Sequence, residues 1–226
     1  MQKEIRIKEL LPNTKIILIA IILSSLSLQL PALFIPHKEN DEVILQVLAE
    51  KVSRNLWDYS LQGTAVLEEF PKSVYDKPLF HHPPLFTYGL ILFRSLLGIK
   101  FQILFPIFAS ILTVLIIFAI AKELYDESVG LLAAFIFSIC PIALHVSTKI
   151  WIDGVLVLFC TLSVYLSILA IKREKAIWYI LAGISFGLAV LSKISALPIL
   201  VPITYLFLKK SLSAKRLTHI LYFQFQ

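Results

Sequence analysis

Residues 101–121 read FQILFPIFASILTVLIIFAIA and contain no Lys, Arg, Asp or Glu. An α-helix of about 20 apolar residues crosses the ~30 Å hydrocarbon core of a bilayer, so this stretch predicts a membrane span. Five further uncharged runs predict spans of the same kind: Ile16–Ile35, Val129–Thr148, Gly154–Ile171, Ala176–Ser192 and Ile194–Leu208. Because the runs are continuous rather than alternating, the sequence predicts an all-α polytopic membrane protein with about six transmembrane helices.

The composition supports this class. Of the 226 residues, 58% are hydrophobic and 16% are charged, against about 45–50% and about 25% in soluble domains. Soluble enzyme folds are therefore excluded, and the 27 aromatic residues (16 Phe, 8 Tyr and 3 Trp) exclude a disordered chain. No nucleotide-binding fingerprint is present, so no nucleotide cofactor is expected. The net charge of +6 is attributed to cytoplasmic loops and not to a nucleic-acid partner.

The basic residues indicate which way the spans point. The apolar stretch Leu85–Ile99 is only about 15 residues long, short of a full span, and contains Arg94. If it does not cross, the N-terminal tail, the turn at Lys122, residues 172–175 and residues 209–216 are all cytoplasmic and hold most of the Lys and Arg. The positive-inside rule therefore favours an interfacial helix at Leu85–Ile99.

The resulting organisation has five parts. They are a cytoplasmic tail (1–15), a first transmembrane helix (16–35), an external loop (36–100), a transmembrane helical bundle (101–208) and a cytoplasmic stretch that opens a further, incomplete helix (209–226). The run at 16–35 is too long for a signal-peptide core and is interpreted as a retained anchor.

The external loop begins with an amphipathic pattern. Apolar residues recur at helical spacing at Leu45, Leu48, Val52, Leu56 and Tyr59, and polar residues from Glu42 to Asp58 follow the opposite side. Asn40 is a suitable N-cap. We expect this helix to lie flat on the membrane with its apolar side against lipid.

Asp41 and Glu42, directly after the first span, are candidates for an external general base. The alternative is that acids in a first helical turn only stabilise the helix N-terminus. Lys77, His81 and His82 precede Pro83-Pro84, a pair that starts a helix well. The histidines are either interfacial polar residues or contacts for a phosphate or a divalent metal, and a lone His-His pair is a weak metal signal.

Two further candidates lie at the outer ends of spans. Asp153 is a boundary residue that pairs with Lys149 four positions earlier, or a part of the site. Lys193 interrupts an apolar stretch that runs from Ala176 to Leu208. It marks a tight external turn, or it faces a polar cavity and binds an anion. Cys140 and Cys160 lie inside apolar runs and predict no metal site.

In this order the motifs resemble a known superfamily. They are the first span followed by Asp41-Glu42, the loop that ends in His-Pro-Pro-Leu, the segment LAAFIFSICPIALHVSTKIWIDGVLVLF with Asp153, and the segment LAGISFGLAVLSKISALPIL with Lys193. Together they resemble the GT-C membrane glycosyltransferases over about residues 10–210. The nearest branch holds the dolichyl-phosphate-mannose protein mannosyltransferases and the bacterial aminoarabinose transferases.

The resemblance implies transfer of a sugar from a polyprenyl-phosphate donor to a hydroxyl of a protein, lipid or glycan. The reaction would take place on the external face of the membrane, the plasma membrane in a prokaryote. By position, Asp41 matches the family's catalytic acid, Glu42 matches its neighbour, and Asp153 matches a second external acid. The cations available to the phosphate are Lys77, His81, His82 and Lys193.

The chain also departs from the family. Aliphatic residues (Val43, Ile44 and Leu45) follow Asp-Glu where the family often has aromatic ones, so the acceptor contacts differ. Family members are usually longer, so the chain is expected to correspond to their N-terminal module. Alternative interpretations are a truncated or non-catalytic protein that binds lipid-phosphate, and a carrier fragment. Charges gathered at one face without an internal repeat favour the transferase over the carrier.

Overall fold

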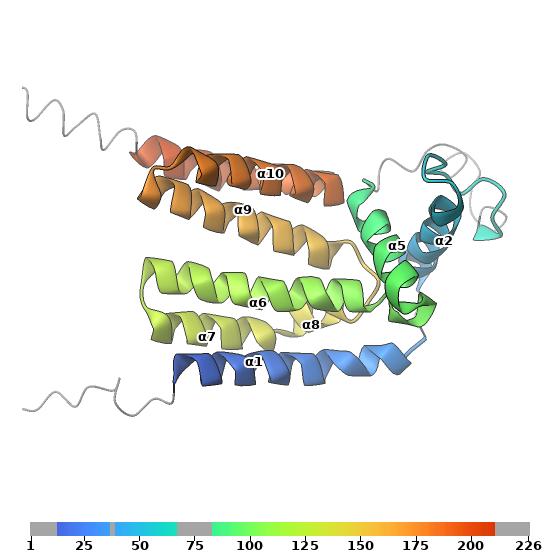
Figure 1. Cartoon of the computed structure of the whole chain (residues 1–226), viewed down its shortest axis with the longest axis horizontal. Helices are drawn as coiled ribbons and strands as arrows, with labels where there is room; N and C mark the ends of the chain where they lie inside the picture. Colours follow the sequence, from blue (N-terminus) through green and yellow to red (C-terminus); the bar gives the residue numbers. More distant parts are fainter. Residues whose placement is uncertain (1–12, 37–38, 67–82, 211–226) are drawn as a thin grey trace, which may run out of the picture.

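The computed structural model describes residues 13–36, 39–66 and 83–210, and their secondary structure is entirely helical (Figure 1). The helices of the bundle are α1 (Thr14–Gln29), α6 (Leu104–Leu124), α7 (Glu127–Ser138), α8 (Pro141–Ser147), α9 (Asp153–Arg173) and α10 (Ala176–Ser192). The others are α2 (Asn40–Arg54), α5 (Leu85–Leu97) and the short 3-10 segments η2 (Leu30–Phe34), η3 (Ile99–Phe101) and η4 (Ile194–Ile199). A last helix covers residues 200–210. The predicted all-α class is confirmed.

Three helical stretches are long and apolar enough to cross a membrane, namely Thr14–Phe34, Ile99–Leu124 and Asp153–Arg173. A fourth is present if α7 and α8 count as one span, although they are bent by 61°. The bend falls where Cys140 is extended and Pro141 starts α8, because proline cannot continue the preceding helix. The prediction of about six spans is therefore not confirmed in the described part of the chain.

The last two predicted spans differ most from expectation. Helix α10 has the predicted bounds, but its 17 residues are short for a span. The run predicted at Ile194–Leu208 begins instead as a 3-10 helix that contains Pro198 and becomes α-helical only from residue 200. Lys193 separates the two with an extended backbone.

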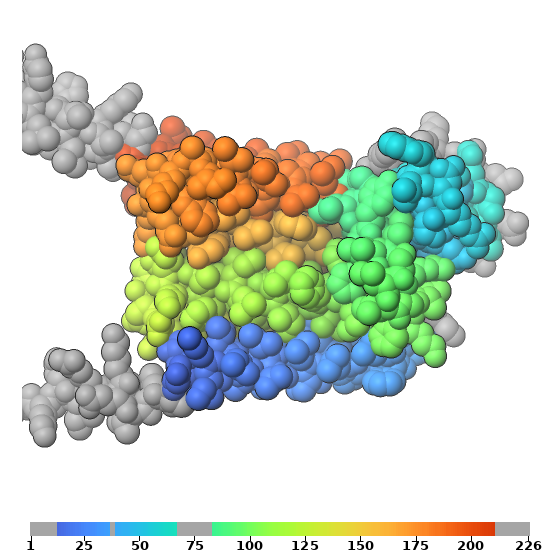
Figure 2. All heavy atoms as spheres, in the orientation of Figure 1, coloured from blue at the N-terminus to red at the C-terminus, as the bar shows by residue number. Residues whose placement is uncertain are grey.

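The bundle helices run side by side, and α2 and α5 lie across one end of them (Figure 1). Helix α9 packs between α10 and α6, α6 packs on α7, and α7 packs on α1. In the space-filling view α2 and α5, in cyan and green, extend beyond this end of the bundle (Figure 2). This arrangement supports an interfacial rather than a spanning position for α5, whose sidedness stays a prediction.

The opposite end of the bundle holds basic turns tied by ion pairs. Lys122 Nζ lies 2.5 Å from Glu127 Oε1, Lys172 Nζ lies 3.3 Å from Glu123 Oε1, and Lys210 Nζ lies 2.5 Å from Glu174 Oε1. These lysines belong to the segments that the positive-inside rule assigns to the cytoplasm. The structure brings them together at one end, away from α2 and α5.

Helix α2 differs from the predicted amphipathic helix in three respects. Its N-cap is Glu39 and not Asn40, because Glu39 and Glu42 form a reciprocal capping box. The helix ends at Arg54, so Leu56 lies beyond it and is 54% exposed. Its apolar face is covered by protein rather than lipid.

That covered face joins α2 to α5 and to the loop that follows α2. Leu45 packs with Phe86 and Leu90 of α5, and Leu48 packs with Leu61 of the loop. The apolar surface that would otherwise meet lipid is thereby removed from solvent within the chain. The apolar side of α2 was predicted correctly, but the lipid expected to cover it is replaced by α5 and the loop. The sequence pattern shows which side of a helix is apolar and not what covers that side.

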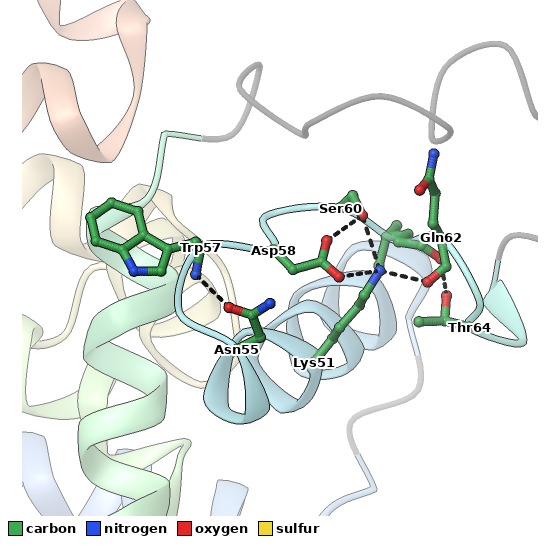
Figure 3. A network of polar contacts seen from close by, with 8 residues as sticks. Lys51, Asn55, Trp57, Asp58, Ser60, Gln62 and Thr64 are labelled. Carbon is green, nitrogen blue, oxygen red and sulfur yellow. Dashed lines mark hydrogen bonds and ion pairs between the residues drawn. The ribbon is translucent and has the colours of Figure 1, made fainter.

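Polar contacts hold the loop after α2 in place (Figure 3). Lys51 Nζ lies 3.1 Å from Asp58 Oδ2 and donates to Ser60 Oγ at 3.0 Å and to the Gln62 carbonyl at 2.5 Å. The Ser60 hydroxyl donates to Asp58 at 2.7 Å. These hydrogen bonds, from Ser60 first and then Lys51, lower the pKa of Asp58 below its ordinary value of 3.8.

The same loop is attached to α5 by Tyr59. Its hydroxyl lies 2.9 Å from Thr87 Oγ1, and both side chains are buried. Burial raises the pKa of Tyr59 to about 12, although the hydrogen bond with Thr87 opposes the rise. Helix α2, its loop and α5 therefore form one packed unit at the end of the bundle.

The first prediction concerns sidedness. In a variant without the two native cysteines, a cysteine at Gln62 should react with a membrane-impermeant maleimide added outside. A cysteine at Arg173 should react only after permeabilisation, because basic turns stay cytoplasmic. External labelling at Arg173 would contradict the assignment of the α2 and α5 end to the outside.

The second prediction concerns the loop network. Because folding lowers the pKa of Asp58, its stabilising contribution is present above the unfolded pKa and is lost as the pH falls through the folded value. Asp58→Asn should raise the opening equilibrium of residues 55–66 at pH 7 by up to about fivefold, as expected for a partly exposed pair. Hydrogen exchange of the loop amides measures this equilibrium. Asp41→Asn, which changes an exposed acid of α2 without a partner among the described residues, is the control, and equal effects of both variants would refute the role of the network.

Candidate functional site

Three acids begin α2, and a fourth begins α9. Glu39, Asp41 and Glu42 lie in or beside the first turn of α2, and Asp153 is the first residue of α9. The turn between α8 and α9 contacts the start of α2 through one hydrogen bond and one ion pair. The predicted acidic residues therefore gather at the end of the bundle that carries α2 and α5 (Figure 1).

Glu42 is a buried structural acid. Its side chain is 3% exposed, although the sequence pattern put it on the polar side of the helix. Oε1 accepts a hydrogen bond from the Ile150 N–H at 3.0 Å, and Oε2 accepts one from the Glu39 N–H at 3.3 Å. A buried carboxylate is tolerated when it receives such donors. Glu42 thus fixes the start of α2 to the turn before α9.

Glu39 forms an ion pair with Lys149. The ammonium of Lys149 also lies 4.8 Å from the centre of the Trp151 ring, in the range of a cation–π contact. The predicted pairing of Lys149 with Asp153 is therefore wrong. The four-residue spacing failed because α8 ends at Ser147 and α9 begins only at Asp153, so the two residues do not share a helix.

Asp153 pairs instead with Lys193, whose Nζ lies 2.7 Å from Asp153 Oδ1. The two side chains are 40% and 38% exposed and join the start of α9 to the end of α10. Lys193 thus lies at the break between α10 and η4, which agrees with the alternative that it marks a turn. Its charge is already matched by the Asp153 carboxylate. An anion that binds at Lys193 would share the lysine with Asp153.

Asp153 also lines a cavity of about 250 Å³ between α6, the bend at Cys140–Pro141 and the start of α9. Most of the wall is apolar, with hydroxyl groups from Ser110 and Thr113. A cavity of this kind accepts an apolar chain more readily than a charged group.

Asp41 is the remaining acid. Its side chain is exposed, and its carboxylate has no hydrogen-bond or ion-pair partner among the residues that the structure describes. Because the two neighbouring glutamates and Asp153 are engaged, Asp41 is the one of these four acids that is open to an incoming hydroxyl. An available carboxylate within reach of such a group is what general-base chemistry requires.

The remaining predicted residues, Lys77, His81 and His82, lie outside the described residues. Pro84, which follows them, is the N-cap of α5. Within the described part of the chain, no three His, Cys, Asp or Glu side chains form a group suited to a metal ion.

Sequence reasoning missed the contributions of Ile150 and Trp151. The Ile150 amide is the donor that holds Glu42, and a backbone contact of this kind carries no sequence signal. The Trp151 ring packs edge-on against His145 with centroids 5.3 Å apart. Its buried Nε1 donor has no partner among the described residues.

Comparison with known proteins supplies the family. A family model described as dolichyl-phosphate-mannose-protein mannosyltransferase matches residues 81–224, more than half of the chain. No curated protein matches. The matched region includes Asp153 and Lys193, and Asp41 and Glu42 precede it. With the apolar helices and the resemblance of the motifs, this match shows that the chain belongs to the dolichyl-phosphate-mannose-protein mannosyltransferase family of membrane glycosyltransferases.

Proposed function

We propose that this chain is a glycosyltransferase module that moves a sugar from a polyprenyl-phosphate donor to an acceptor hydroxyl at the external face of the membrane. Membership of the family supports glycosyl transfer in general. One observation carries the assignment of the general base. Asp41 is exposed and unpartnered among the described residues, while the acids around it are engaged.

In the proposed reaction, Asp41 accepts the proton of the acceptor hydroxyl. The hydroxyl oxygen forms a bond to the anomeric carbon as the bond from that carbon to the phosphate oxygen breaks. The polyprenyl phosphate leaves with the electron pair of the broken bond. A single displacement of this kind inverts the anomeric centre. The protein's contribution is to place the base and to stabilise the negative charge on the leaving group.

Lys193 is the described cation that we assign to the phosphate. Its ion pair with Asp153 lies at the end of α9 and α10 that our proposal takes as external, and the ammonium is partly exposed. A phosphate at this site would therefore meet a preoriented lysine and a nearby carboxylate. Lys77, His81 and His82 are further candidates on the segment before α5.

Glu42 has a different role in this proposal from the one its position next to Asp41 suggests. Its oxygens accept backbone N–H groups from Ile150 and Glu39. It therefore orients the first turn of α2 relative to the turn that leads into Asp153. We assign Glu42 as a positioning residue and Asp41 as the base.

The third prediction tests the base. Asp41→Asn keeps the size of the side chain but removes its basicity, so transfer should fall by about 10²–10⁴-fold. The assay measures sugar transfer from a polyprenyl-phosphate sugar in isolated membranes, normalised to the amount of protein. Glu50→Gln, the same type of change further along α2, should retain activity. Near-normal transfer by Asp41→Asn would refute the assignment.

The fourth prediction separates Glu42 from Asp41. Glu42→Gln replaces an acceptor oxygen with an amide group that cannot satisfy both backbone donors. The loss should be about 1–3 kcal/mol of stability, the range for an unmet buried hydrogen bond. Thermal unfolding in detergent measures the change, and transfer per folded molecule should fall far less than in Asp41→Asn. A stable Glu42→Gln protein without activity would show that Glu42 is the base.

A further inference from the structure

A second cavity lies apart from the sugar-transfer residues. It is a groove of about 690 Å³ between the chain that follows α1 and the segment at η3, with part of α2 as one wall. Neither Asp41 nor Asp153 nor Lys193 lines it. Its walls combine apolar side chains, including Phe34, Ile35 and Phe101, with the polar side chains of Gln46, Lys100 and Gln102.

Gln102, one of the residues that line this groove, has an acceptor oxygen without a partner among the described residues. The side chain is 3% exposed, and its Nε2 donates to Gln46 Oε1 at 2.7 Å. Gln46 Nε2 in turn donates to the Glu42 carbonyl at 3.1 Å, so the orientation of both amide groups is fixed. Gln102 Oε1 is left buried without a partner. A buried acceptor is stabilised by a ligand that brings a donor.

Lys100 brings a positive charge. It is exposed and has no ion-pair or hydrogen-bond partner among the residues that the structure describes. It lies in η3, near the start of the apolar stretch Ile99–Leu124. A lysine at the end of a membrane span lies in the headgroup region of a bilayer.

The apolar wall of the groove lies at the end of the other adjoining span. Phe34 closes the stretch Thr14–Phe34 and is 87% exposed, and Ile35 follows it. These side chains line the groove together with Lys100 and Gln102. A ligand that satisfies the groove therefore has an apolar chain, a negative charge and a hydroxyl donor.

We propose that this groove binds an anionic glycerophospholipid with a hydroxylated headgroup, represented by phosphatidylglycerol. The phosphate lies at Lys100, a headgroup hydroxyl donates to Gln102 Oε1, and an acyl chain covers Phe34, Ile35 and Phe101. Phosphatidylcholine lacks both the net charge and the hydroxyl. Phosphatidylmethanol is a phosphodiester with the same single negative charge but no hydroxyl, and it therefore isolates the contribution of Gln102.

The test is native mass spectrometry of the purified full chain, loaded with each of the three lipids at equal concentration. Phosphatidylglycerol should be retained in preference to both others. Lys100→Gln should weaken its retention about fivefold, the effect expected for one basic residue near an anionic headgroup. Lys175→Gln, which changes an exposed lysine at the opposite end, should have no effect. Gln102→Met should remove the preference over phosphatidylmethanol.

Thermal unfolding in phosphatidylcholine shows whether each variant is folded before it is compared. Equal retention of phosphatidylglycerol and phosphatidylcholine would overturn the proposal, as would equal losses in the two lysine variants. Equal retention of phosphatidylmethanol by the unmodified protein would overturn the role of Gln102. Displacement of phosphatidylglycerol by an equimolar polyprenyl phosphate would assign the groove to the sugar donor instead. Loss of transfer in Asp41→Asn is independent of all these outcomes.

Discussion

The hydrogen bond from the Ile150 amide to the Glu42 carboxylate links the two parts of this molecule. It joins α2, which lies across the end of the bundle, to the turn that leads into α9. The carboxylate is buried, so it needs backbone donors, and it receives them from Ile150 and Glu39. Loss of either hydrogen bond would leave one oxygen of this buried carboxylate without a donor. The start of α2 is thereby fixed, and Asp41 with it.

The helices of the bundle were predictable because long uncharged apolar runs have few alternatives in a membrane protein. Helix α10 has the predicted bounds, and the bounds of α6 and α9 each lie within a few residues of the predicted ones. The prediction failed where proline interrupts a run. Pro141 bends the α7–α8 stretch, and Pro198 lies in a 3-10 segment. Hydropathy measures whether a segment is apolar, but it does not measure whether the segment stays straight.

The candidate site was less predictable, because its residues are arranged by tertiary contacts. Asp41 and Glu42 are adjacent acids in the sequence, yet Asp41 is exposed and Glu42 is buried. The pairing of Asp153 with Lys193 joins residues on different helices, and no local spacing indicates it. The Glu-x-x-Glu spacing at 39–42 was the one available signal for the cap. It was obscured because Asn40 is a better N-cap by residue type.

The groove and the proposed sugar-transfer residues share one connection. Gln102 donates to Gln46, Gln46 donates to the Glu42 carbonyl, and the Glu42 carboxylate accepts from Ile150. These contacts run from the groove wall to the first turn of α2, which carries Asp41. A lipid headgroup bound at Gln102 would therefore act on the same helix that positions the proposed base. Such a link would give the bilayer a physical route to the proposed reaction, since the helix that holds the proposed base would also contact the bound lipid.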